Sequence, residues 1–165
     1  MKPRVGVIGC DGEISKKLRE ISERIGEDVA KNNSLLMCGG RGGIMEAVCK
    51  GAKRAGGITI GILPSLNSKD ANPYVDIPIT TGIGQARNAL VVSCSDVVIA
   101  INGRVGTLSE IGLALSYGKP VVIVKNTGGV ADSIEKELEK MGISQRVYPA
   151  DFDNAVKIAL SLVKI

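Results

Sequence analysis

The chain has 165 residues, of which 44% are apolar, 23% charged and 2% aromatic, and it contains no histidine or tryptophan. A chain of this length can bury one sizeable hydrophobic core, so we expect residues 1–165 to form a single domain. The absence of histidine excludes Ser-His-Asp and Cys-His catalytic sites, and it excludes zinc sites that need an imidazole ligand.

The charge pattern disfavours a nucleic-acid partner. The formal net charge of +4 comes from 21 basic and 17 acidic side chains, which are interspersed along the chain. Nucleic-acid-binding proteins usually concentrate Lys and Arg on one face and place stacking aromatic residues among them, but this chain has three Tyr and one Phe. We therefore expect a small-molecule partner instead.

The cysteines and the apolar segments predict a soluble protein of the cytoplasm. The four cysteines show no C-x-x-C spacing and mostly lie in or beside apolar segments, as buried free thiols do in a reducing compartment. The first apolar stretch, which ends at Gly9, is too short for a signal peptide. The longest one, Ala89–Ile101, is interrupted by Asp96, so we expect no membrane-spanning segment.

Short apolar segments alternate with longer amphipathic ones, and glycines mark the transitions. Segments that are apolar on both faces are typical of parallel strands covered by helices. We predict strands at Val5–Ile8, Leu35–Cys38, Ile58–Leu63, Val97–Ile101 and Val121–Val124. We predict helices at Glu13–Lys31, Ile44–Arg54, Gln85–Ser93, Leu108–Tyr117, Ala131–Met141 and Asn154–Val163. This order predicts an α/β fold: a single-domain, doubly wound, Rossmann-like and mostly parallel sheet with helices on both faces.

One segment interrupts the alternation. Pro64–Pro78 is rich in proline, asparagine and serine, and it follows the third predicted strand. We predict a long loop here, and loops of that length in small domains are commonly functional or mobile.

Glycine-rich turns follow three predicted strands, at Gly9–Gly12, Gly39–Gly43 and Gly103–Thr107. The carboxyl ends of parallel strands meet at one edge of a sheet, and ligands bind there at the point where the strand order reverses. Glycine lets backbone N–H groups approach an anion, and the following helix presents the positive end of its dipole. The glycines of any one cluster can equally be explained as tight turns. Three clusters at one edge favour a phosphate-bearing ligand.

Two common nucleotide-binding motifs are absent. The fingerprint G-x-G-x-x-G does not occur, because Gly6, Gly9 and Gly12 are spaced by three, and no acidic residue ends the second predicted strand. The P-loop pattern G-x-x-x-x-G-K-[ST] does not occur either. We therefore expect neither NAD nor FAD in the usual binding mode, and no P-loop NTPase.

Thr107 and Glu110 allow two interpretations. Their S/T-x-x-E spacing is that of a capping box, in which Glu110 would bond back to the Thr107 amide. Alternatively, a carboxylate in the first turn of a helix above the carboxyl edge of the sheet faces the ligand crevice. Arg87 lies in a mostly apolar predicted helix, so its charge needs either that crevice or a partner. We favour the interpretation in which Glu110 contacts the ligand.

Three motifs together resemble the LOG-like Rossmann superfamily, and the resemblance covers about residues 5–124. The motifs are Gly39-Gly40-Arg41-Gly42-Gly43-Ile44-Met45, Gln85-Ala86-Arg87-Asn88 and Gly103-x-x-Gly106-Thr107-x-x-Glu110, of which the Gly-Thr-x-x-Glu element is the most specific. The superfamily includes cytokinin-activating phosphoribohydrolases and molybdenum cofactor carrier proteins. In the phosphoribohydrolases an Arg and this Glu serve hydrolysis of the N-glycosidic bond of a nucleoside 5′-monophosphate, while the glycine loop and the Thr hold the phosphate.

The resemblance implies roles for particular residues. By motif match, Arg87 and Glu110 would be the catalytic residues if the protein is an enzyme. The residues that we expect to bind the ligand or its phosphate lie in two glycine-rich loops, where Arg41 or Arg104 would supply charge: Gly39, Gly40, Arg41, Gly42, Gly43, Gly103, Arg104, Gly106 and Thr107. The implied ligand is a nucleotide or a molybdopterin-type molecule, and none of these motifs predicts a metal site.

Some positions depart from the hydrolases. Hydrolases typically have Pro-Gly-Gly where this chain has Ile101-Asn102-Gly103, Arg-Lys where it has Arg87-Asn88, and Gly where it has Glu46. A carboxylate at position 46 would repel a bound phosphate if it faced inward. The segments Ala86–Asn88 and Ser109–Leu115 look closer to the carrier branch.

We therefore expect a carrier or sensor that holds a phosphorylated small molecule, and the alternative is a phosphoribohydrolase that cleaves a nucleoside 5′-monophosphate. A pyridoxal-phosphate decarboxylase is disfavoured, because no Lys lies in the glycine-rich strand ends where a Schiff base would form.

The sequence also predicts a homo-oligomer. The segments Ala86–Cys94 and Ile111–Tyr117 are apolar nearly all round, whereas a helix that covers one face of a sheet needs a single apolar stripe. We expect their outer sides to contact a second copy of the chain, in a dimer or a dimer of dimers. Members of the superfamily that the sequence resembles assemble in this way, with the pocket near the interface.

Overall fold

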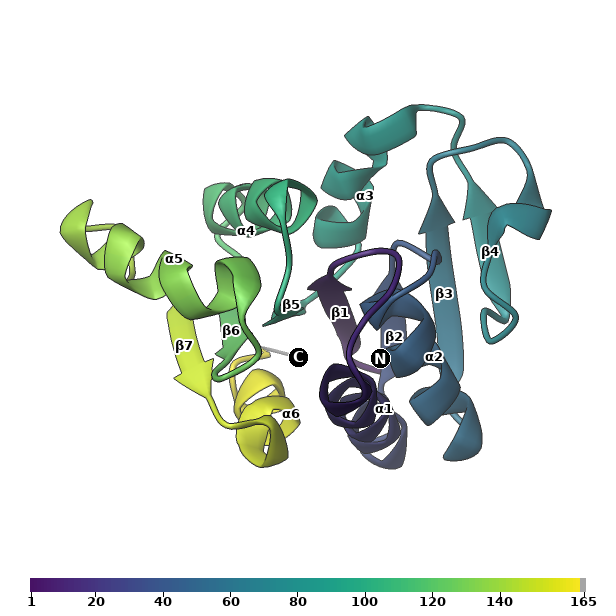
Figure 1. Cartoon of the computed structure of the whole chain (residues 1–165), viewed down its shortest axis with the longest axis horizontal. Helices are drawn as coiled ribbons and strands as arrows, with labels where there is room; N and C mark the ends of the chain where they lie inside the picture. The colour runs from purple at the N-terminus through teal and green to yellow at the C-terminus, as the bar shows by residue number, and fades with distance from the viewer. Residues whose placement is uncertain (164–165) are drawn as a thin grey trace.

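The computed structural model describes residues 1–163, and within them seven parallel strands form one sheet (Figure 1). In chain order the strands are β1 (Arg4–Gly9), β2 (Leu35–Cys38), β3 (Ile58–Leu63), β4 (Ile77–Thr80), β5 (Val97–Ile101), β6 (Val121–Val124) and β7 (Val147–Ala150). Their order across the sheet is β4-β3-β2-β1-β5-β6-β7, and every neighbouring pair is parallel. The strand order therefore reverses between β1 and β5, the place where doubly wound sheets bind ligands.

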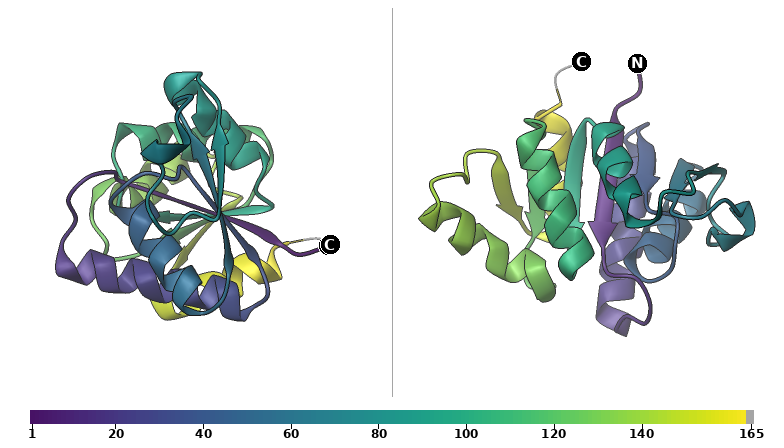
Figure 2. Two further views of the ribbon diagram at one scale, coloured as in Figure 1. Left: turned by 90° about the vertical axis from the view of Figure 1, so that its right-hand side faces the viewer. Right: turned by 90° about the horizontal axis from the view of Figure 1, so that it is seen from above.

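Helices cover both faces of the sheet (Figures 1 and 2). They are α1 (Lys16–Lys31), α2 (Ile44–Arg54), α3 (Asn88–Ser93), α4 (Val105–Ser116), α5 (Gly129–Lys140) and α6 (Phe152–Ser161), with short 3-10 helices η1 (Ser68–Asp70) and η2 (Gly84–Arg87). One face is covered by α1, α2 and α6, and the other by α3, α4 and α5. The predicted doubly wound α/β fold is confirmed. In the described part of the chain, no helix is both long and apolar enough to cross a bilayer.

The central strand β5 shows why the buried strands are apolar at every position. Its five residues are fully buried. Val97, Ile99 and Ile101 pack in the core beneath α1, α2 and α6, whereas Val98 and Ala100 pack beneath α3, α4 and α5. Successive side chains of a strand point to opposite faces, so a strand that is covered on both faces needs an unbroken apolar run.

The prediction missed both edge strands. The segment Pro64–Pro78 was predicted as one loop, but β4 begins at Ile77 and includes Pro78. All four residues of β4 are exposed, and β7 includes Pro149, so neither segment has the continuous apolar pattern of a central strand. Proline lacks the N–H that a central ladder requires, and edge strands tolerate it because only one of their sides is paired.

Helix starts also differ from the prediction. The helix predicted over Gln85–Ser93 is the 3-10 helix η2 followed by the short helix α3. The helix predicted from Glu13 begins at Lys16, because the Ser15 side chain caps it by accepting a hydrogen bond from the Leu18 N–H (3.2 Å). The helix predicted from Leu108 begins three residues earlier, at Val105, which decides the environment of Glu110 described below.

The loop between β3 and β4 supports the glycine-rich loop Gly39–Gly43, which we call the first glycine loop. Asn72 is buried, its backbone N–H donates to the Gly40 carbonyl (2.9 Å), and its side-chain amide donates to the Arg41 carbonyl (2.8 Å). These two bonds fix the backbone of the first glycine loop. The β3–β4 connection extends far enough to place Asn72 beside that loop.

Candidate functional site

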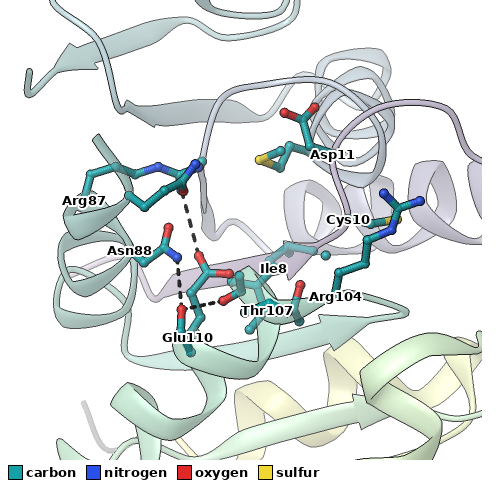
Figure 3. Close-up of a pocket in the computed structure, with 16 residues that line it drawn as sticks. Ile8, Cys10, Asp11, Arg87, Asn88, Arg104, Thr107 and Glu110 are labelled. Carbon is teal, nitrogen blue, oxygen red and sulfur yellow. Dashed lines mark hydrogen bonds and ion pairs between the residues drawn. The ribbon is translucent and has the colours of Figure 1, made fainter. Parts of the chain in front are cut away.

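A cavity of about 410 Å³ lies at the carboxyl edge of the sheet, beside the switch point between β1 and β5 (Figure 3). Four parts of the chain line it: the end of β1 with its following loop, the region around β2 and α2, the η2–α3 segment, and the start of α4. The lining residues are Val7, Ile8, Gly9, Cys10, Asp11, Gly39, Met45, Gln85, Arg87, Asn88, Arg104, Val105, Gly106, Thr107, Ser109 and Glu110.

Arg87 and Glu110 form a buried charged pair in this cavity. The Arg87 Nη1 and Glu110 Oε1 atoms are 3.9 Å apart, and each side chain is 8% exposed. Figure 3 shows the two side chains approaching each other from η2 and α4. The pair is too long for a hydrogen bond, so both charges keep capacity for another partner.

The guanidinium of Arg87 lies against Gly39 and keeps a donor without a partner within residues 1–163. A Cβ atom on Gly39 would lie only 2.3 Å from Nη1 and 2.6 Å from Nη2, so a glycine at position 39 makes room for the guanidinium. The buried Nε of Arg87 has no hydrogen-bond partner within residues 1–163. Burial lowers the pKa of Arg87, and the Glu110 carboxylate opposes this effect. A buried donor without an acceptor is costly, which makes Arg87 a candidate to receive a ligand acceptor.

Burial raises the pKa of Glu110 to about 7, and the Arg87 charge opposes this rise. The capping-box interpretation of Glu110 is wrong. Helix α4 has Arg104 at its N-cap, so Thr107 is a residue inside the first turn, and Glu110 lies one turn further along and faces the cavity. A buried carboxyl that titrates near neutral pH and lines a cavity is typical of functional sites.

The N-terminus of α4 opens into the cavity without a cap. The Arg104 side chain makes no capping hydrogen bond, and the first turn holds no acidic residue. Within the described chain, the backbone N–H groups of Val105, Gly106 and Thr107 donate to no acceptor. Unpaired N–H groups and the helix dipole together make a helix start attractive to anions.

Two sets of contacts fix the position of this helix start. On one side, the Asn88 amide donates to the Ser109 hydroxyl (3.1 Å), which donates to the Gly106 carbonyl (2.7 Å). On the other side lies a set that we call the Asn102–Thr127 contact. The Asn102 N–H donates to Thr127 Oγ1 (2.9 Å), the Asn102 amide donates to the Thr127 carbonyl (2.6 Å), and the Gly103 N–H donates to Asn102 Oδ1 (2.6 Å). Thr127 does not line the cavity, yet it holds the loop that leads into α4.

The first glycine loop already has an anion beside it. Asp11 Oδ1 accepts hydrogen bonds from the N–H groups of Gly12 (2.8 Å) and Gly42 (3.0 Å), and Arg41 Nε lies 3.7 Å from Asp11 Oδ2. In addition, the Gly40 N–H donates to Cys38 Sγ (3.3 Å). The N–H groups of Gly40 and Gly42, which glycine-rich loops commonly offer to phosphate, are thus satisfied within the protein.

The structure brings some of the predicted site residues together and separates others. Six line the cavity: Gly39, Arg87, Arg104, Gly106, Thr107 and Glu110. Five do not: Gly40, Arg41, Gly42, Gly43 and Gly103. Gly103 serves instead as a backbone link, because its carbonyl accepts from the Val130 N–H (3.1 Å).

The prediction of site residues missed Asp11, Gln85, Asn88 and Ser109, which are polar and line the cavity. Gln85 and Asn88 flank Arg87 in the motif that carried the family resemblance, so their proximity to Arg87 was a usable signal. Asp11 sits in a glycine-rich turn next to Gly12, a place where an acidic residue is unusual if the turn binds an anion. Ser109 gave no signal of this kind.

Known structures share this fold over nearly the whole chain. The molybdenum cofactor binding protein from Rippkaea orientalis superposes with a TM-score of 0.89 and 37% identity, covering 98% of each chain. The molybdenum cofactor carrier protein from Chlamydomonas reinhardtii superposes with a TM-score of 0.87 and 33% identity, again over 98% of each chain.

Comparison of the sequence identifies a named relative and a family. The chain is 30% identical over 121 residues to a cytokinin riboside 5′-monophosphate phosphoribohydrolase from Mycobacterium tuberculosis, which covers 68% of this chain and 65% of that protein. The model of the SLOG cluster4 family matches residues 2–152. The chain therefore belongs to the SLOG cluster4 family.

Proposed function

We propose that the cavity binds a phosphorylated small molecule, either a nucleotide or a molybdopterin-like molecule, which the protein carries or senses. One observation carries the proposal: the uncapped start of α4 opens into a cavity that is also lined by Arg87, whose buried Nε has no hydrogen-bond partner within residues 1–163. Both features offer N–H donors to an anion, and they come from different parts of the chain.

The phosphate binds at the start of α4 in this proposal. The backbone N–H groups of Val105, Gly106 and Thr107 supply donors, and the exposed Arg104 supplies a positive charge at the rim. The first glycine loop is left out as a phosphate site, because Asp11 bonds to it. A cavity of about 410 Å³ is within the range of pockets that hold small ligands.

The named relatives support ligand binding of this kind. The two structural neighbours are described as molybdenum cofactor binding and carrier proteins, and the sequence relative is described as acting on a riboside 5′-monophosphate. One description names a cofactor and the other a riboside 5′-monophosphate, so each concerns a small molecule, and the two structural neighbours share the fold that builds this cavity.

The alternative function is hydrolysis of the N-glycosidic bond of a nucleoside 5′-monophosphate. The Arg87–Glu110 pair favours it, because a carboxyl with a pKa of about 7 can donate or accept a proton at neutral pH. In that reaction Glu110 would act on the leaving base or on water, and Arg87 would orient the substrate.

Calorimetric titration of the purified protein with AMP, adenosine and inorganic phosphate tests the proposal. We expect AMP to bind at least tenfold more tightly than adenosine, and Arg104→Ala to weaken AMP binding severalfold, as loss of a charged hydrogen bond implies. Arg19→Ala, on the exposed face of α1, is the matched control and should leave binding unchanged. Equal affinity for AMP and adenosine would contradict a phosphate site.

Chromatography of the same AMP samples decides between carrier and hydrolase. Release of free adenine by the wild type, and not by Glu110→Gln, would establish the hydrolase. Binding without release supports the carrier or sensor, and native mass spectrometry of freshly purified protein should then reveal a phosphorylated ligand that copurifies.

A further inference from the structure

The two helix starts that flank the cavity differ in charge. The first turn of α4 contains no acidic residue, whereas the first turn of α2 contains Glu46. The Asp11 carboxylate bonds to the Gly42 N–H, one residue before the Gly43 N-cap of α2. An anion bound at the α4 start therefore meets unpaired donors, whereas an anion at the α2 start would meet a resident carboxylate.

The backbone is shaped to hold Asp11 in this position. Its Oδ1 accepts from two N–H groups, those of Gly12 and Gly42. A Cβ atom on Gly42 would lie 3.0 Å from that same oxygen, which is a tight contact, so glycine at position 42 admits the carboxylate. Asp11 is thus a built element of the cavity wall.

The second oxygen of Asp11 remains available. Within residues 1–163, Oδ2 accepts no hydrogen bond, and its nearest cation is Arg41, whose Nε lies 3.7 Å away. The Asp11 side chain is 51% exposed and lines the cavity. An ionised carboxylate oxygen is a strong acceptor and has no donor of its own.

We propose that Asp11 is a specificity-determining residue, which accepts a hydrogen bond from a hydroxyl or amino group of the ligand and rejects a second phosphate at its end of the cavity. This inference rests on the proposed function, because it assumes that a phosphate occupies the α4 start. The ligand class that follows has one phosphoryl group and, away from it, a neutral part rich in hydrogen-bond donors. A ligand whose second phosphate would lie beside Asp11 is disfavoured by like-charge repulsion.

Three nucleotides test the role of Asp11 by calorimetric titration: AMP, adenosine 3′,5′-bisphosphate, and 2′,3′-dideoxyadenosine 5′-monophosphate. The second replaces a ribose hydroxyl by a phosphate, and the third removes both ribose hydroxyls. We expect the wild type to bind AMP on the order of tenfold more tightly than either analogue, as a like-charge contact and a lost hydrogen bond to a charged group imply.

Asp11→Asn removes the charge and keeps an oxygen that can accept from Gly12 and Gly42. We expect this variant to bind AMP and the bisphosphate within about threefold of each other, because the repulsion is gone. Asp153→Asn, at an exposed position of α6, changes the net charge equally and should retain the wild-type preference. Thermal melting of each variant confirms that the fold is kept.

The outcomes separate the two proposals. If the wild type binds neither AMP nor inorganic phosphate, the proposed function fails, and the role of Asp11 fails with it. If AMP binds and Asp11→Asn keeps the wild-type preference over the bisphosphate, the phosphate site stands and the role of Asp11 is refuted. If Asp153→Asn loses the preference as well, general charge rather than Asp11 determines the specificity, and the inference is again refuted.

Discussion

The Arg87 guanidinium and the Glu110 carboxylate lie 3.9 Å apart, each with 8% of its side chain exposed, at the meeting point of η2 and α4. The two charges stabilise each other, but both have lost water without gaining a close hydrogen bond in return. Each charge shifts the pKa of the other, so a substitution at either position changes the electrostatic environment of its partner. This interdependence leads to the first two predictions.

Glu110 should make the stability of the protein depend on pH. The pKa of Glu110 is about 7 in the folded protein, and its ordinary value is 4.5. Between these pH values the folded state therefore binds the proton more tightly than the unfolded state does. The free energy of unfolding should therefore fall as the pH rises from 4.5 to 7, by up to roughly 3 kcal/mol for a shift of this size. Urea unfolding of the wild type and Glu110→Gln at pH 5 and pH 8 measures this, and the loss should be absent from the variant. Parallel pH profiles for the two proteins would contradict the raised pKa.

Arg87→Ala and Glu110→Gln should damage the same property. We expect each single variant to reduce AMP affinity or turnover by on the order of tenfold, because a charged hydrogen bond is lost. The double variant should lose less than the product of the two effects, since both groups share one ligand. Unchanged binding in Glu110→Gln would show that Glu110 does not contact the ligand.

Gly39→Ala should impair binding with little cost in stability. The new Cβ would collide with the guanidinium of Arg87, which is the far end of a long, flexible side chain and can shift to relieve the contact. We expect a melting temperature within a few degrees of the wild type and an AMP affinity reduced on the order of tenfold. Gly112→Ala is the matched control, because a Cβ at that position of α4 meets nothing within 4 Å. Equal AMP affinity in the two variants would contradict the spacing role of Gly39.

The protein should be a homo-oligomer that buries the outer sides of α3 and α4. Leu90 is 37% exposed, Leu108 44% and Tyr117 46%, so large apolar side chains project from both helices. Light scattering should report at least twice the chain mass of 17.2 kDa, and Leu108→Glu should shift the protein toward the monomer. A wild-type mass of one chain at micromolar concentration would contradict this prediction.

Thr127→Val should weaken phosphate binding from outside the cavity. The substitution keeps the shape but removes the Oγ1 atom that accepts from the Asn102 N–H, leaving a partly buried donor unpaired. We expect a loss of stability of about 1–3 kcal/mol and a severalfold weaker AMP affinity. Thr127→Ser retains the hydroxyl and should restore affinity for AMP. Failure of Ser to restore it would place the effect in packing rather than in the Asn102–Thr127 contact.

The central part of the fold could be predicted from the sequence, and the edges could not. β5 shows a continuous apolar run, because helices cover both of its faces. β4 contains Pro78 and four exposed residues, and nothing in its local pattern distinguishes an edge strand from a loop. Its strand character comes from pairing with β3, a contact between distant residues that local sequence does not encode.

Part of the candidate site could likewise be predicted from the sequence, and part could not. Arg87 stood out because a charge in an apolar segment needs a partner, a rule that works on the sequence alone. The environment of Glu110 depended on where α4 begins, and helix boundaries vary with tertiary context: Val105 starts the helix although no side chain caps it. The bond from the Gly42 N–H to Asp11 joins residues 31 positions apart, so only the folded chain reveals it.

Through the Asn102–Thr127 contact, the position of the α4 start depends on Thr127, a residue that does not line the cavity. The start of α5 also binds this loop, because the Ala131 N–H donates to the Asn102 carbonyl (2.9 Å). A change at Thr127 can therefore alter how firmly the α4 start is held while the shape and charge of the cavity wall stay the same. Under the proposed function, the firmness of phosphate binding would be tuned at Thr127, just before α5, and the choice of ligand would be tuned at Asp11, so these two properties could be changed separately.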